Sequence, residues 1–208
     1  DRRRVALHLY SCFWASFYVY ANPLWRVRVL GRAKLPWRGP AVIVANHLSL
    51  VDILVLYGLY RPFKWVSKEE NFKLPFAGWN MTLNGYVRLA RGDRTSIRGR
   101  MERSLALLRE GAPLLVFPEG TRSRDCRVKA FKKGLFYAAV RVGCPVVPVA
   151  LHGTGAVMGK GAADIVSHGA RRDAQRVHVR IGSPLAPGLP VRPRVRGRHC
   201  EWCRTCYP

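Results

Sequence analysis

The stretch ANHLSLVD, residues 45–52, places a histidine and an aspartate close together, directly after the apolar run AVIV. A carboxylate that accepts a hydrogen bond from one imidazole nitrogen fixes the tautomer and raises the basicity of the other nitrogen. His47 and Asp52 are therefore the residue types of a general base and its orienting partner. Polar residues near a strand end also commonly cap a helix or face solvent, so this stretch alone leaves both interpretations open.

The spacing of the two residues limits how they could meet. Inside one helix, a separation of five residues gives about 140° of rotation and about 7.5 Å of rise, so the side chains would not touch. They can meet if His47 lies in a turn and the helix begins near Ser49, a residue type common at helix N-caps. The preceding run AVIVA predicts a buried strand, which favours this geometry.

Two further polar stretches could bind phosphate. FPEGTRSR, residues 117–124, follows the apolar run PLLVF, and its Gly120 permits a tight turn with exposed backbone amides. Arg122 offers a planar guanidinium suited to phosphate, and Glu119 could orient a neighbouring arginine. GYVRLAR places Arg91 at the end of another apolar run. The alternative for each arginine is a surface salt bridge.

Short apolar runs alternate with segments of helical periodicity between residues 41 and 182. This alternation predicts a mixed, largely parallel α/β sheet flanked by helices. Ligands of such sheets bind at the carboxyl ends of the strands, where the three polar stretches are expected to gather. The predicted strands are 41–45, 63–67, 86–90, 113–117, 146–151 and 177–182, and the predicted helices are 48–59, 74–85, 95–111 and 131–142.

Residues 1–30 form an apolar and aromatic segment with arginines near both ends. Its apolar run, Val5 to Ala21, is shorter than the roughly 20 residues that span a bilayer upright. Aromatic rings at helical spacing suit the headgroup boundary of a membrane, so we expect a helix that enters one leaflet. A helix of the protein core is the alternative. The aromatic residues are Tyr10, Phe13, Trp14 and Phe17, and the arginines are Arg2, Arg3, Arg4, Arg26 and Arg28.

The formal net charge of +24 points to an anionic partner, which could be nucleic acid, an anionic membrane surface or a phosphorylated substrate. An arginine-biased genome would also contribute to this excess. The aromatic residues concentrate in the apolar N-terminal run, and no nucleic-acid-binding motif is present, so nucleic acid is the weaker interpretation. A hydrophobic content of 49% excludes both a disordered chain and a polytopic membrane protein.

The six cysteines do not form a disulfide pattern, which favours a reducing compartment. Residues 185–208 are rich in Pro, Arg and Gly without apolar periodicity, and we expect a disordered tail. The run His199, Cys200, Cys203 and Cys206 is too compressed for the two separated ligand pairs that zinc prefers, so no metal is expected.

NHLSLVD resembles the NHxxxxD signature of the PlsC-like glycerolipid acyltransferase family. GYVRLAR, FPEGTRS and VVPVAL resemble the second, third and fourth blocks of that family, in the same order. The similarity extends from about residue 31 to residue 184, which defines the expected acyltransferase domain. The resemblance implies direct acyl transfer to lysophosphatidic acid, giving phosphatidic acid. Acyl-CoA or acyl-carrier protein would be the donor, and no cofactor would be needed.

The resemblance also implies roles for individual residues. His47 would be the general base and Asp52 its partner, while Lys68 is a further candidate for the site. The implied location is the cytoplasmic face of a bacterial inner membrane, on anionic lipid. Alternatives are another lysolipid acceptor, such as a lyso-ornithine lipid, or a basic nucleic-acid-binding protein. The implied phosphate-binding residues are Arg91, Glu119, Gly120, Thr121 and Arg122, and the implied acyl channel is Val147, Pro148 and Val149, which strand packing explains equally well.

Overall fold

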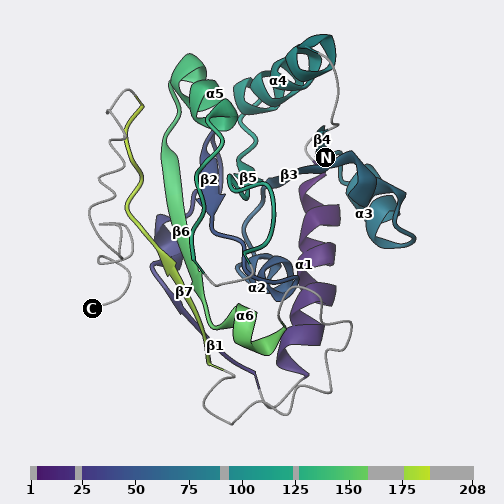
Figure 1. Ribbon diagram of the computed structural model, residues 1–208, viewed down its shortest axis with the longest axis vertical. Helices are drawn as coiled ribbons and strands as arrows, with labels where there is room; N and C mark the ends of the chain where they lie inside the picture. The colour runs from purple at the N-terminus through teal and green to yellow at the C-terminus, as the bar shows by residue number, and fades with distance from the viewer. Residues whose placement is uncertain (1–3, 22–24, 90–93, 124–126, 159–175, 188–208) are drawn as a thin grey trace.

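A computed structural model describes residues 4–21, 25–89, 94–123, 127–158 and 176–187. Within these residues, seven strands form one sheet in the order β1-β7-β6-β2-β5-β3-β4 (Figure 1). Neighbouring strands run parallel except β6 and β7, which are antiparallel, so the prediction of a mixed, largely parallel α/β sheet is confirmed. The strands are β1 (Arg26–Leu30), β2 (Val42–Ala45), β3 (Lys64–Lys68), β4 (Val87–Leu89), β5 (Leu114–Val116), β6 (Val146–His152) and β7 (Arg176–Ile181).

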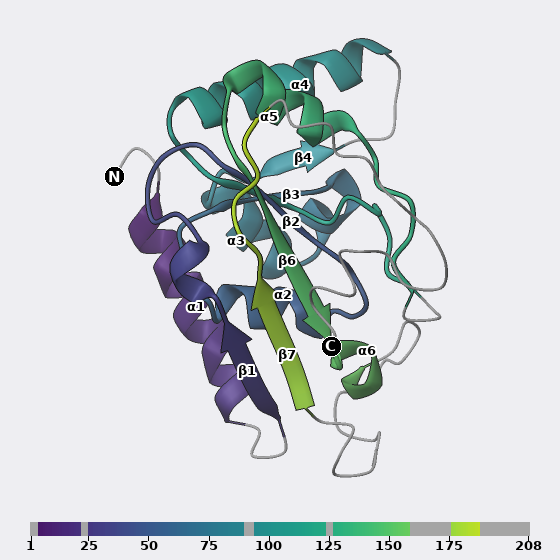
Figure 2. The same ribbon diagram turned by 90° about the vertical axis from the view of Figure 1, so that its left-hand side faces the viewer.

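Helices cover both faces of the sheet. The α-helices are α1 (Val5–Tyr20), α2 (Val51–Tyr57), α3 (Ala77–Leu83), α4 (Arg94–Arg109), α5 (Gly134–Val142) and α6 (Thr154–Val157), with short 3-10 helices η1 (Arg32–Lys34) and η2 (Glu69–Lys73). Figures 1 and 2 show α4 and α5 lying together and apart from α1 and α2. Two separate core clusters correspond to these two pairs of helices.

The residues of β2 show why the sheet has two apolar faces. Val42 and Val44 belong to the core cluster of α4 and α5, whereas Ile43 and Ala45 belong to the cluster of α1 and α2. All four side chains are buried. Successive residues of a strand point to opposite faces, so a parallel strand between two helical layers needs a continuous apolar run. The run AVIV satisfies this requirement and places the polar residues that follow it at the carboxyl edge.

The predicted elements are present with shifted ends, whereas β1, α6 and the two 3-10 helices η1 and η2 were not predicted. α2 begins at Val51 rather than near Ser49, and α6 is a single short turn after β6. β1 lies inside the apolar segment 1–30 and pairs in parallel with β7 at the edge of the sheet. Leu185, the first residue of the expected tail, exchanges backbone hydrogen bonds with Val146 of β6. The rest of that tail from residue 188 lies outside the described residues.

α1 carries its polar residues inward and its rings outward. His8, Ser11 and Ser16 are buried against the domain, whereas six aromatic side chains of α1 are exposed. In the part of the chain that the structure describes, no helix has the length and apolar character needed to cross a membrane. The exposed rings are Tyr10, Phe13, Trp14, Phe17, Tyr18 and Tyr20.

Candidate active site

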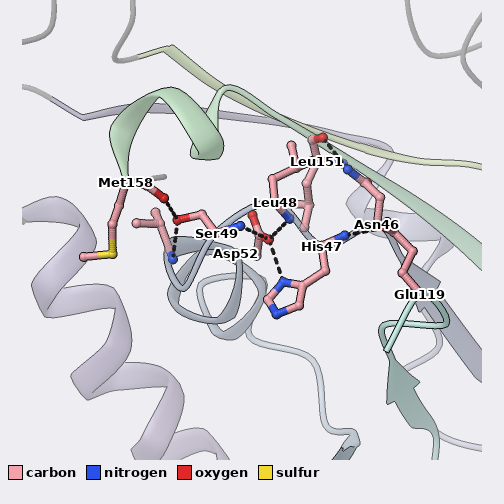
Figure 3. A network of polar contacts seen from close by, with 9 residues as sticks. Asn46, His47, Leu48, Ser49, Asp52, Glu119, Leu151 and Met158 are labelled. Atoms are coloured by element: carbon pink, nitrogen blue, oxygen red, sulfur yellow. Dashed lines mark hydrogen bonds and ion pairs between the residues drawn. The ribbon is translucent and has the colours of Figure 1, made fainter. Parts of the chain in front are cut away.

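The loop between β2 and α2 brings His47 and Asp52 together (Figure 3). His47 Nδ1 lies 2.9 Å from Asp52 Oδ2. The same oxygen accepts hydrogen bonds from the backbone N–H groups of Leu48, at 2.6 Å, and Ser49, at 2.8 Å. Ser49 Oγ in turn accepts from the backbone N–H of Val51 at 3.1 Å, which organises the first turn of α2. The histidine therefore lies in the turn and the aspartate in the helix, the arrangement that the spacing requires.

These contacts fix which nitrogen of His47 is free. Asp52 Oδ2 is an acceptor for two backbone donors, so the imidazole nitrogen that faces it is the third donor. Nε2 is then left as the acceptor of the ring. The Phe117 ring stacks on the imidazole, with centroids 3.8 Å apart and planes 8° apart. Asp52 is fully buried and the His47 side chain is 14% exposed, so the imidazole is held in position and part of it is open to solvent.

Asn46 joins the loop that carries His47 to β6. Its Nδ2 donates to the Leu151 carbonyl at 2.9 Å, and its Oδ1 accepts from the Leu151 N–H at 2.8 Å. The register of β2 and β6 ends at the pair of Ala45 and Val149, so the Asn46 carboxamide replaces the next backbone pairing and lets the chain leave the sheet at His47. Ser49 Oγ also donates to the Met158 carbonyl at 2.6 Å, beyond β6.

Glu119 joins the same loop to the segment after β5. Its Oε1 accepts from the backbone N–H of His47 at 2.9 Å, and its Oε2 accepts from that of Lys129 at 3.0 Å. The backbone N–H of Ser123 donates to the His47 carbonyl at 2.8 Å. Burial raises the pKa of the Glu119 carboxyl, and the hydrogen bonds from these two N–H groups oppose that shift. Both oxygens of this side chain are therefore engaged by backbone, and its predicted phosphate contact stays a prediction.

Of the residues expected to bind phosphate, those that the structure describes follow β5, and Lys68 ends the neighbouring β3. Gly120 has a φ of 71°, a conformation that favours glycine. The Lys132 ammonium lies beside this turn, 2.8 Å from where a Cβ of residue 120 would be. Arg122 is half-buried, and so is Lys68 at the end of β3. β2, β5 and β3 are adjacent, so these residues share an edge of the sheet with His47. Thr121 is half-buried in the same turn, whereas Arg91 lies outside the described residues.

Val147 and Val149 are core residues in this structure. Both are fully buried in the cluster of α1 and α2, and they pair with Ile43 and Ala45 of β2. Pro148 is half-buried and its carbonyl accepts from the backbone N–H of Gly182 at 2.9 Å. Their role as an acyl channel stays a prediction.

Some residues of the site could not be expected from the motifs alone. Phe117 and Lys132 were not predicted as partners of the site; the basic run RVKAFKKG was the available signal for the lysine. Among the described residues, no group of three or more His, Cys, Asp or Glu side chains could hold a metal ion. The run from His199 to Cys206 lies outside those residues. His152 ends β6, with its ring centroid 6.4 Å from that of His178.

Comparison with known proteins agrees with this geometry. Residues 26–152 match the family described as Acyltransferase. A 1-acyl-sn-glycerol-3-phosphate acyltransferase of Chlamydomonas reinhardtii is 46% identical over 160 residues, covering 76% of this chain and 48% of that protein. A chloroplastic enzyme of the same name from Arabidopsis thaliana is 42% identical over 168 residues, covering 80% of this chain and 47% of that protein.

The chain thus spans about half the length of these curated relatives, with 48% and 47% of their residues covered. The crystal structure of the 1-acyl-sn-glycerophosphate (LPA) acyltransferase PlsC from Thermotoga maritima superposes with a TM-score of 0.68 and 30% identity, covering 90% of this chain and 73% of that one. The relatives give no support to the nucleic-acid-binding alternative. With its sheet, its four sequence blocks and its His–Asp pair, the chain belongs to the acyltransferase family.

Proposed function

We propose that the chain transfers an acyl group from acyl-CoA or acyl-carrier protein to the free hydroxyl of lysophosphatidic acid, giving phosphatidic acid. The single observation that carries this proposal is the 2.9 Å contact between His47 Nδ1 and Asp52 Oδ2, which leaves Nε2 as the base. The names of the relatives supply the substrate class.

The proposed step is a direct transfer without an acyl-enzyme. His47 Nε2 takes the proton of the acceptor hydroxyl while the hydroxyl oxygen attacks the thioester carbonyl carbon. A carbon–oxygen bond forms, the carbon–sulfur bond breaks, and the imidazolium returns its proton to the leaving thiolate. Asp52 holds the imidazole in the required tautomer throughout. The sequence has no GxSxG nucleophile elbow, which agrees with a base that activates the acceptor itself.

The acceptor phosphate is proposed to bind where the cations of the carboxyl edge gather. Arg122 offers a planar fork, and the turn at Gly120 lies beside Lys132. Lys68 and Arg91 extend the same proposal to the ends of the neighbouring strands. Glu119 would act by holding the backbone of His47 and Lys129 in place, because its own charge repels phosphate. Thr121 is the remaining member of this proposed set.

α1 is proposed to contact the membrane in which the substrates reside. A helix that buries histidine and serine while exposing aromatic rings is matched to an apolar surrounding on its outer side. Trp14 and Phe17 would enter the headgroup boundary, and basic residues would meet anionic lipid. Relatives occur in chloroplasts as well as bacteria, so the expected bacterial inner membrane is not favoured by them.

This membrane contact is tested by substitution rather than truncation. Cys12 and Val19 of α1 lie in the core and β1 lies in the sheet, so removing residues 1–30 would remove part of the fold. The double variant Trp14→Ser with Phe17→Ser should float less with anionic liposomes than the unchanged protein. Equal flotation of a correctly folded variant would exclude these rings as the anchor.

The acyl transfer itself is tested with a panel of lysolipids. Purified protein is incubated with a labelled acyl thioester and with lysophosphatidic acid, lyso-ornithine lipid or a lysophospholipid without a phosphomonoester. We expect labelled phosphatidic acid as the main product. Rapid acylation of lyso-ornithine lipid with slow acylation of lysophosphatidic acid would favour the alternative acceptor, and labelling of no lipid would refute both.

A further inference from the structure

α3 turns large apolar side chains to the outside and a polar side chain toward the protein, with Met81 as its apolar contact to the core. Of its residues, all of which are described, only Gly78 is buried. The polar Asn80 points toward α1, whereas Trp79 is 62% exposed and Leu83 is 59% exposed. A surface helix in water turns its apolar side to the core and its polar side to solvent. The side of α3 that faces away from the protein is thus suited to an apolar surrounding.

Polar contacts fasten α3 to α1 in this orientation. Asn80 Nδ2 donates to Ser11 Oγ at 2.8 Å, and Asn84 Nδ2 donates to the same oxygen at 3.2 Å. Arg4, just before α1, donates to the carbonyls of Thr82 and Leu83 at the end of α3. Gly78 packs so closely on η2 that a Cβ would clash with the Phe72 carbonyl. These contacts hold α3 beside α1, as Figure 1 shows. Met81 packs against the core, whereas Trp79 and Leu83 are exposed.

The segment that leads into α3 adds to the same surface. Leu74 is exposed, and Phe76 is 77% exposed with a φ of 58°. A positive φ is unfavourable for a bulky residue and is found where the surrounding structure or a function maintains it. The Phe76 and Trp79 rings contact each other edge to face, with centroids 5.3 Å apart. An unfavourable backbone conformation therefore places this ring pair at the surface.

We propose that Leu74, Phe76, Trp79 and Leu83 form a second membrane contact, beside α1, on an anionic phospholipid bilayer. Residues 74–87 contain no charged side chain, while the exposed Lys73 and Arg88 flank them and Arg4 lies at the far end of α3. This composition of aromatic and apolar residues with a basic rim is the one that enters the headgroup region of anionic membranes. Glu69 and Glu70 lie one turn earlier, in η2.

The position of α3 also bears on how the substrate reaches His47. β3 ends at the carboxyl edge, and η2 and α3 follow it along the chain, so the segment that leads to Phe76 starts at the edge that holds the active site. A bilayer that touches both α1 and α3 would lie against the layer that contains α2, whose first turn carries Asp52. Identification of the surrounding as a bilayer rests on the proposed lipid substrate, whereas the orientation of α3 does not.

The test uses the full chain and flotation with vesicles of equal parts phosphatidylcholine and phosphatidylglycerol. The double variant Phe76→Ser with Trp79→Ser is compared with the double variant Tyr137→Ser with Val140→Ser. These two residues of α5 are also more than half exposed but belong to the other helical layer. We expect the α3 variant to lose roughly tenfold or more of its membrane partitioning, because each large apolar side chain favours burial by about that factor. The α5 variant should float like the unchanged protein. Equal melting temperatures of the three proteins would show that folding is not responsible.

A second readout separates this proposal from the proposed enzyme activity. If both hold, the α3 variant acylates lysophosphatidic acid in vesicles more slowly but acylates a short-chain, water-soluble lysophosphatidic acid at the unchanged rate. Absence of acylation by every protein would refute the activity and leave the flotation result to stand by itself. Flotation of the α3 variant equal to that of the unchanged protein would overturn the membrane contact. So would a dimer of the unchanged protein in solution that the α3 substitutions dissociate, because the surface would then bind a second copy.

Discussion

The Glu119 carboxylate holds two segments of backbone, so Glu119→Gln should weaken both the fold and the loop that carries His47. A carboxamide keeps one acceptor oxygen and replaces the other by an NH2 group, which then faces an N–H donor of His47 or Lys129. Lys129 is exposed and its N–H can turn to water, so we expect the oxygen to stay with His47.

The expected loss of stability follows from these contacts. A hydrogen bond to a charged acceptor contributes about 1.5–3 kcal/mol, and one such bond is lost. Burial raises the pKa of the carboxyl, so removing the charge relieves part of this loss, and we expect about 2 kcal/mol. For a chain of 208 residues this corresponds to a melting temperature lower by roughly 4–8 °C. A displaced His47 should lower kcat by roughly tenfold to a hundredfold.

The assay combines urea unfolding with steady-state kinetics. If Glu119 acts by holding backbone, kcat falls while KM for lysophosphatidic acid changes little. Glu110→Gln, at an exposed carboxylate after α4, is the control and should alter neither stability nor kcat. Unchanged stability together with a strongly raised KM for lysophosphatidic acid would refute the reasoning and return Glu119 to the phosphate site.

Three further outcomes are expected. Arg122→Gln should lower kcat/KM for lysophosphatidic acid by roughly tenfold or more without changing KM for the acyl donor, and equal losses toward both substrates would contradict phosphate binding. Asn46→Ala should lower the free energy of unfolding by about 2 kcal/mol and also lower kcat, because both hydrogen bonds to Leu151 are lost. An unchanged urea midpoint would exclude a stabilising role for these two hydrogen bonds. Burial lowers the pKa of His8 from 6.5 to about 4. As pH falls from 6.5 to about 4, the histidine is protonated in the unfolded chain but not in the folded one, so the free energy of unfolding falls by about 3 kcal/mol in all. His8→Gln should flatten this dependence in urea unfolding measured from neutral to acidic pH, and an unchanged slope would assign it to other groups.

The parts of the fold that sequence predicts are those with a local or periodic cause. Val42, Ile43, Val44 and Ala45 are apolar without interruption because both faces of β2 are covered, and this is visible in the sequence. β1 was missed because it is an edge strand in which exposed arginines alternate with partly buried valines, so it lacks the continuous apolar run of the buried strands. α3 was predicted as a helix, but its orientation was not, because the usual pattern assumes that apolar residues point inward.

The candidate site also has a part that the sequence predicts and a part that it does not. His47 and Asp52 are five positions apart, so helix geometry alone limits how they meet. The hydrogen bonds between Asn46 and Leu151 join residues 105 positions apart, and the hydrogen bond from His47 to Glu119 joins residues 72 positions apart. Such contacts depend on the order of strands in the sheet, which spacing along the chain does not contain.

The most direct measurement of the central claim is the rate at which His47→Ala converts labelled acyl thioester and lysophosphatidic acid into phosphatidic acid. Removal of the general base should lower kcat by on the order of a hundredfold or more, and Asp52→Asn should cost less, because the imidazole remains. Urea unfolding confirms that each variant is folded. A folded His47→Ala protein that forms phosphatidic acid at the full rate would contradict the proposed mechanism.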